Sequence, residues 1–154
     1  MTPDQKRLVR ETWKQVTPMA DAAADLFYRR LFEIDPGTRE LFHATDMLAQ
    51  REKLLQTLAF AVGNLDKLDE LVSTVEALGR RHAGYGVTSA HYDSVGAALL
   101  WTLEQGLGRA WTPAVASAWS EIYELLAAVM RGAAEDHVAA KRVAAGQRTQ
   151  STPV

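Results

Sequence analysis

The chain has 154 residues, of which 47% are hydrophobic, and no shift in composition divides it, so we expect one domain with a substantial core. The formal net charge is −2 and basic residues never run longer than two, which argues against nucleic acid and anionic membranes as partners. Because cysteine is absent, disulfides, iron–sulfur clusters, thiolate catalysis and cofactors attached through thioether bonds are excluded.

The N-terminal segment, residues 1–13, is charged and amphipathic and lacks the apolar core of a secretion signal. No apolar run in the chain approaches the roughly 20 residues that are needed to cross a bilayer. We therefore expect a cytoplasmic protein with no membrane partner.

Four prolines follow a residue whose side chain can cap a helix. The four pairs are Thr2-Pro3, Thr17-Pro18, Asp35-Pro36 and Thr112-Pro113. Proline at the first helical position loses no hydrogen bond, and Thr or Asp accepts from the unpaired backbone N–H groups. Each pair therefore predicts a helix start, and Gln5 completes a capping box with Thr2.

Further helices are predicted from about residue 46 to 63, 66 to 82 and 89 to 106, with Gly84 and Gly86 breaking the chain after the second of these. Apolar residues recur at helical spacing along four helices. The four stripes are Ala24, Phe27, Tyr28 and Leu31; Leu68, Leu71, Val72, Val75, Leu78 and Gly79; Tyr92, Val95, Gly96, Leu99 and Leu103; and Trp119, Ile122, Tyr123, Leu126, Met130 and Ala133.

No segment alternates in the way a strand does, so the predicted fold class is all-α, with about seven helices. Some of these helices are too short and too unevenly spaced for a simple four-helix bundle. We expect one domain over residues 1–145, followed by a polar tail, residues 146–154, that we expect to be disordered.

His82 continues the apolar stripe of the predicted helix 66–82, so its imidazole faces apolar packing. An unpaired buried polar group costs roughly 1–3 kcal/mol, so this ring must find a hydrogen-bond partner or bind something. Two interpretations stay open at this point, a core histidine satisfied by a backbone carbonyl and a metal ligand.

Tyr28 and Gln50 are two further polar residues on apolar stripes, Gln50 because it lies four residues before Leu54. Taken singly, such residues are usually hydrogen-bonded to backbone or solvated. Together with His82 they suggest a pocket with a nitrogen ligand on one side and two hydrogen-bond donors on the other. An iron-bound diatomic gas needs such a pocket.

Several pieces of the sequence occur in a specific order: Leu26–Phe32, Asp35-Pro36 with Leu41-Phe42, Gln50 with Leu54, Leu78–His82, and Tyr92. This set, within residues 5 to 133, resembles the globin family, and more closely the single-domain bacterial hemoglobins and the globin half of flavohemoglobins. The resemblance implies a globin fold, with three-over-three helix packing around non-covalent heme b and its iron.

The resemblance also implies roles for individual residues. His82 is implied to bind the heme iron, Phe42 to wedge against the heme, Tyr28 and Gln50 to act as the pair beside the gas ligand, and Leu54 to lie above the iron. An ordinary core Phe is a compatible interpretation of Phe42. Further residues implied at the heme are Arg81, Val87, Tyr92, Val95 and Tyr123. Arg81 is a candidate partner of a heme propionate, and an exposed arginine without a role is its alternative.

The other histidines, His43, His91 and His137, are most simply surface residues, and none lies four residues before Leu54. We therefore expect an open or weakly occupied sixth coordination site. The flavohemoglobins carry a glutamate where this chain has Ala134, so the carboxylate that would make the ligand imidazole more basic is missing. Strong peroxidase activity is accordingly not expected.

The implied function is reversible oxygen binding with high affinity, with nitric oxide and carbon monoxide as other ligands. Conversion of nitric oxide to nitrate is a further implied activity. No Gly-x-Gly-x-x-Gly motif or reductase domain is present in the sequence, so we expect the electrons to come from a separate reductase. The alternatives are a gas or redox sensor, a weak peroxidase-like heme protein and a heme-free helical interaction module; the oligomeric state stays open.

Overall fold

The computed structural model describes the backbone of residues 1–150 and the side chains of residues 1–146. Within this part of the chain there are helices and no strands, which confirms the all-α prediction. The α-helices are α1 (Pro3–Val16), α2 (Ala20–Ile34), α3 (Met47–Gly63), α4 (Leu68–Gly84), α5 (Ser89–Leu107) and α6 (Pro113–Gln150). Short 3₁₀ helices are η1 (Thr17–Met19), η2 (Pro36–Phe42) and η3 (Gly108–Ala110).

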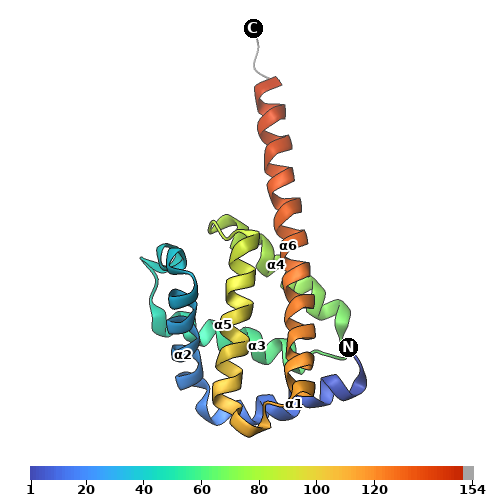
Figure 1. Ribbon diagram of the computed structural model, residues 1–154. Helices are drawn as coiled ribbons and strands as arrows, with labels where there is room; N and C mark the ends of the chain where they lie inside the picture. Colours follow the sequence, from blue (N-terminus) through green and yellow to red (C-terminus); the bar gives the residue numbers. More distant parts are fainter. Residues whose placement is uncertain (151–154) are drawn as a thin grey trace.

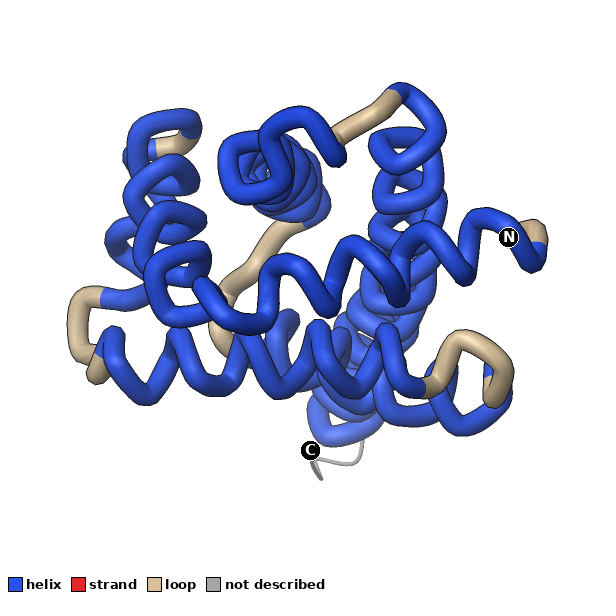
Figure 2. Tube along the Cα trace, turned by 90° about the horizontal axis from the view of Figure 1, so that it is seen from below, coloured by secondary structure: helices blue, strands red, loops and turns tan. Residues whose placement is uncertain are grey.

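Helices α2, α5 and α6 run in roughly one direction in Figure 1, and α1 lies across their lower ends, so the helices do not form a simple parallel bundle. α4 packs mainly on α6, α2 packs on α5, and α1 crosses α6. Figure 2 shows some helices nearly end-on while others run across the view. Their apolar stripes meet in one main core, whose buried side chains include Val9, Phe27, Leu31, Leu103, Trp119 and Ile122. No helix of the described chain is long and apolar enough to span a bilayer.

Two of the four predicted caps form as expected. The Thr2 side chain accepts from the Gln5 backbone N–H at 3.1 Å, and the Gln5 side chain accepts from the Thr2 N–H at 2.9 Å, which completes the capping box. The Thr112 hydroxyl accepts from the Val115 N–H at 3.2 Å at the start of α6. These contacts satisfy backbone donors that have no partner inside the helix.

At the other two pairs a helix does begin, but it is a 3₁₀ helix, and the predicted side-chain cap is wrong because each side chain has a different partner. The Thr17 hydroxyl donates to the Trp13 carbonyl at 2.8 Å, at the end of α1. The Asp35 carboxylate accepts from the Ser94 hydroxyl of α5 at 2.9 Å. The Thr17-Pro18 pair thus lies in the 3₁₀ helix η1, and Asp35-Pro36 leads into the 3₁₀ helix η2. The helix α2 begins later than predicted, at Ala20.

The start of α4 also differs from the prediction. Asp66 pairs with Lys6 at 3.3 Å and with Arg10 at 2.5 Å, which holds it toward α1 and outside the helix. Leu68 is consequently the first residue of α4 and is 52% exposed, so its predicted place in the inward stripe is wrong. At the other end α4 continues to Gly84, and the chain reverses at Gly86, whose φ of +89° favours glycine.

The last helix, α6, has 38 residues and is about 57 Å long. Its final part projects beyond the other helices (Figure 1). The backbone of residues 146–150 belongs to α6, and residues 151–154 lie outside the described residues, so the expected disorder of this tail stays a prediction.

Helices α4 and α6 touch through their backbones at Gly79. A Cβ placed at Gly79 would lie 2.6 Å from the Met130 carbonyl oxygen and 2.7 Å from the Met130 Cα. Real Cβ atoms do not approach backbone atoms so closely, so any larger residue would force α4 and α6 apart. This contact lies three residues before His82 on α4.

We expect Gly79→Ala to lower the free energy of unfolding by about 1–3 kcal/mol, because overpacking at a rigid contact outweighs the helix propensity that alanine gains. Urea unfolding measures this difference. Gly84→Ala is the matched control, since nothing lies within 4 Å of a Cβ at that position of the same helix. Equal unfolding midpoints for the two variants would contradict the close contact.

Candidate functional site

His82 lies near the end of α4 with one ring nitrogen engaged. Its Nδ1 is 2.8 Å from the Leu78 carbonyl oxygen. A carbonyl oxygen only accepts hydrogen bonds, so Nδ1 carries the proton and Nε2 presents its lone pair. Burial lowers the pKa of His82 and the Arg81 charge adds to this effect, while the Leu78 contact opposes it. The ring is therefore a neutral imidazole with a free Nε2.

This arrangement satisfies both interpretations of His82 that the sequence left open. The backbone carbonyl partner is what a buried core histidine requires. The same contact fixes the tautomer and the ring orientation, which is what a metal-ligating histidine requires of its second nitrogen. Among the described residues, Nε2 has no hydrogen-bond partner.

Tyr28 and Gln50 are in direct contact. Tyr28 on α2 is only 5% exposed, and its hydroxyl oxygen accepts from Gln50 Nε2 on α3 at 3.2 Å. Burial raises the pKa of Tyr28 and the Gln50 contact lowers it slightly, so the phenol keeps its proton at neutral pH. Because the hydroxyl oxygen is the acceptor toward Gln50, its own O–H remains available for donation to a third group.

Phe42 stands at the end of η2 and joins this pair. Its ring packs edge-on against the Tyr28 ring, with 5.6 Å between centroids and 73° between planes. The Phe32 ring packs against both of these rings, with its centroid 5.9 Å from that of Phe42 and 6.3 Å from that of Tyr28. Edge-to-face packing of this kind fixes ring orientation. The aromatic cluster therefore holds the Tyr28 hydroxyl in a defined place.

The remaining apolar residues expected at the site are only partly buried. Leu54, Val95 and Tyr123 pack against the main core but stay partly exposed, and so does Val87 after the end of α4. The structure thus joins Tyr28, Gln50 and Phe42, whereas the described contacts of His82 are with its own helix and with Tyr85, whose ring lies 6.4 Å away.

Tyr92 and Tyr123 connect α5 to α6. The Tyr123 hydroxyl donates to the Tyr92 carbonyl, and its ring lies so close to Gly96 that a Cβ there would be 2.6 Å from it. The Tyr92 hydroxyl, in contrast, is buried and has no partner in the described structure. The Arg131 guanidinium lies 5.4 Å from the Tyr92 ring and pairs with Asp93 at 2.7 Å.

Neither Tyr92 nor a carboxylate contacts His82 in the described part of the chain. The Tyr92 hydroxyl does not reach His82, whose Nδ1 is occupied by the Leu78 carbonyl. No carboxylate contacts His82 either, and Arg81 is exposed and makes no ion pair in the described part of the chain. The imidazole therefore has a neutral hydrogen-bond partner.

Sequence reasoning missed three polar residues near these positions. Arg51, next to Gln50, pairs with Asp25 of α2 at 2.5 Å. His91 accepts from the Thr88 N–H at 2.9 Å and so takes the place of Glu or Gln in a capping box. Asp25 lies three residues before Tyr28, so the two side chains share one face of α2. This spacing could have indicated that Asp25 has a polar partner close to Gln50.

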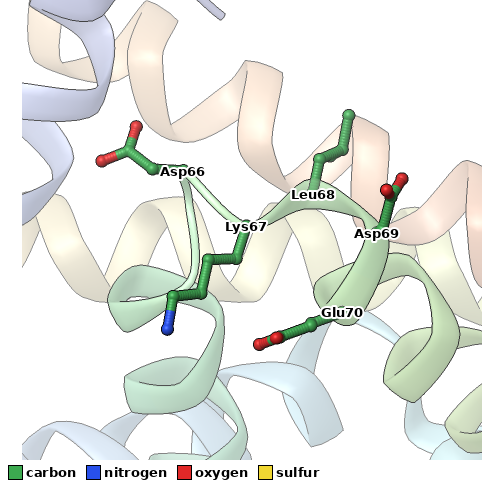
Figure 3. A pocket seen from close by; sticks show the side chains of 5 residues that line it. All are labelled: Asp66, Lys67, Leu68, Asp69 and Glu70. Atoms are coloured by element: carbon green, nitrogen blue, oxygen red, sulfur yellow. The ribbon is translucent and has the colours of Figure 1, made fainter.

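A separate surface pocket lies at the turn before α4 and is lined by Asp66, Lys67, Leu68, Asp69 and Glu70 (Figure 3). Figure 3 shows the carboxylates of Asp66 and Asp69 pointing away from each other. Asp66 is already paired with α1. None of the residues expected at the site lines this pocket. Within the described residues, no group of three or more His, Asp and Glu could hold a metal ion.

Comparison with known proteins gives consistent results. The family model described as globin matches residues 25–130. Neuroglobin of Dissostichus mawsoni is 32% identical over 143 residues, covering 84% of this chain and 90% of that protein. Neuroglobin of Chaenocephalus aceratus is 31% identical with the same coverage.

A solved structure is also similar in fold. The hexacoordinated heme protein from an anhydrobiotic tardigrade, crystallised at pH 4, superposes with a TM-score of 0.79. The match covers 88% of this chain and 96% of that chain at 18% identity. The architecture is therefore the globin fold. The closer resemblance to bacterial hemoglobins and flavohemoglobins stays a prediction.

The unpaired Tyr92 hydroxyl leads to a prediction for the protein without a cofactor. We expect Tyr92→Phe to leave the free energy of unfolding unchanged or higher, because it removes a buried hydroxyl that has no partner. Tyr123→Phe, the matched control, loses a hydrogen bond and should lower stability by about 1 kcal/mol. Chemical denaturation compares the two. A larger loss for Tyr92→Phe would show that its hydroxyl is paired.

Proposed function

The chain belongs to the globin family, and we propose that it binds oxygen reversibly and with high affinity at a non-covalent heme b whose iron is held by His82. Family membership implies heme with iron as the cofactor and a diatomic gas such as oxygen as the ligand. The observation that carries the high-affinity part is the buried Tyr28 hydroxyl, which accepts from Gln50 and keeps its own proton for donation.

The residues present fit a heme. His82 is neutral with Nε2 free, as an iron ligand must be. Phe42, Leu54 and Val95 are partly exposed apolar side chains beside the core, which a flat apolar group would cover. The Tyr92 hydroxyl is a buried donor that has no hydrogen-bond partner among the described residues. When bound, heme iron supplies the position at which a diatomic gas coordinates.

The chain's own residues would then determine how long the gas stays. A diatomic gas that draws electron density when bound would be stabilised by a nearby O–H donor, and the Tyr28 hydroxyl is such a donor. A charge-assisted hydrogen bond is worth roughly 1.5–3 kcal/mol, and about 1.4 kcal/mol corresponds to a factor of ten in rate. Tyr28 is the donor in this proposal, Gln50 orients the phenol and adds a second N–H, and Phe42 holds the ring.

We propose nitric oxide dioxygenation as an activity of the same site. The net reaction combines oxygen with nitric oxide to give nitrate and consumes one electron in each turnover. A separate cytoplasmic reductase would supply this electron. Repeated formation of nitrate with an added reductase supports the proposal, and a single stoichiometric oxidation would leave a gas-binding protein. The neutral partner of His82 is not the carboxylate that favours peroxidase chemistry.

The hydroxyl of Tyr28 can be tested directly. We expect Tyr28→Phe to speed oxygen dissociation from the reduced, heme-loaded protein by at least about tenfold, because it removes the donor and keeps the ring. Stopped-flow displacement of oxygen measures the rate. Tyr85→Phe is the control, since Tyr85 is 70% exposed. An unchanged rate for Tyr28→Phe would mean that the hydroxyl acts elsewhere.

A further inference from the structure

The first half of α3, residues 47–60, is held less firmly than its end. No side chain in this range is fully buried, whereas Ala61 and Val62 lie in the core. Leu48 is 73% exposed, and Leu54 is only partly buried against the core. Met47 and Leu58 are likewise only partly buried against the core, so polar contacts with α2 contribute to the position of this half.

Two side-chain hydrogen bonds join this half to α2, and they lie next to each other. Gln50 donates to the Tyr28 hydroxyl at 3.2 Å, and Arg51 Nη2 donates to the Asp25 carboxylate at 2.5 Å. Asp25 and Tyr28 are three residues apart, so they share one face of α2. The ion pair thus lies one helical turn from the Tyr28 contact.

The ion pair is the stronger of these two contacts. The amide–hydroxyl contact joins two neutral groups, whereas the guanidinium–carboxylate contact is charge-assisted. The side chains of Arg51 and Asp25 are 30% and 28% exposed, so solvent screens the pair less than it screens a surface pair.

We propose that Asp25 and Arg51 are positioning residues for the gas-binding pocket. Their ion pair holds the first half of α3 against α2 and so keeps Gln50 within reach of Tyr28. Without the pair, this half of α3 moves away from α2 and Gln50 loses its contact, which leaves the Tyr28 hydroxyl as the only donor. This inference rests on the proposed function, because it assigns Gln50 and Tyr28 to a gas ligand.

The kinetic test uses the heme-loaded, reduced full chain. We expect Arg51→Gln to speed oxygen dissociation by about three- to tenfold, and Arg51→Lys, which keeps the charge, to restore part of the difference. In a Gln50→Ala background, Arg51→Gln should have no further effect, because Arg51 acts through Gln50.

Arg29→Gln is the matched control. Arg29 pairs with the same carboxylate at 3.0 Å, but from within α2, and its side chain is 73% exposed. It cannot tie α3 to α2, so we expect an oxygen dissociation rate within about twofold of the wild type. Equal effects of Arg29→Gln and Arg51→Gln would overturn the proposal.

A second readout does not depend on heme. Hydrogen–deuterium exchange of the amides of residues 47–60 should be faster in Arg51→Gln and in Asp25→Asn than in the wild type or Arg29→Gln. Unchanged exchange in these two variants would overturn the proposal, whatever the kinetics. Failure of the chain to bind heme would instead overturn the proposed function, and the exchange experiment would still decide whether the ion pair holds α3.

Discussion

The hydrogen bond from His82 Nδ1 to the Leu78 carbonyl is the interaction on which the proposed heme site depends. It satisfies one ring nitrogen inside α4, fixes the tautomer and leaves the other nitrogen as a lone-pair donor. Burial keeps the ring neutral. The backbone contact between Gly79 and Met130 brings α4 close to α6 three residues before His82 and so fixes where the two helices meet. The position of His82 is thus set by backbone geometry.

The other side of the site is built differently, from side chains on three separate elements. Tyr28 belongs to α2, Phe42 to η2 and Gln50 to α3, and their contacts join residues that are distant in sequence. The rings are fixed by the core, whereas Gln50 sits on the part of α3 with no fully buried side chain. This cluster therefore has one rigid member, Tyr28, and one adjustable member, Gln50, and in our proposal the ion pair of Asp25 and Arg51 holds the adjustable one in place.

Much of this could be predicted from local sequence, and the rest depended on tertiary contacts. Helical spacing alone predicted the buried faces of α2, α5 and α6 and placed Tyr28 and His82 on inward stripes. The Thr17 and Asp35 caps failed because Trp13 and Ser94 offered other partners. Leu68 turned outward because Asp66 is held by α1. The Asp25–Arg51 pair and the unpaired Tyr92 hydroxyl likewise depend on how the helices pack.

The most direct measurement of the central claim is a hemin titration of the wild type and His82→Gly, followed by absorption in the Soret region. We expect tight binding and a histidine-ligated spectrum for the wild type, loss of that spectrum in His82→Gly, and its recovery on adding free imidazole. A His82→Gly spectrum identical to that of the wild type, or a wild type that binds no hemin, would contradict the claim.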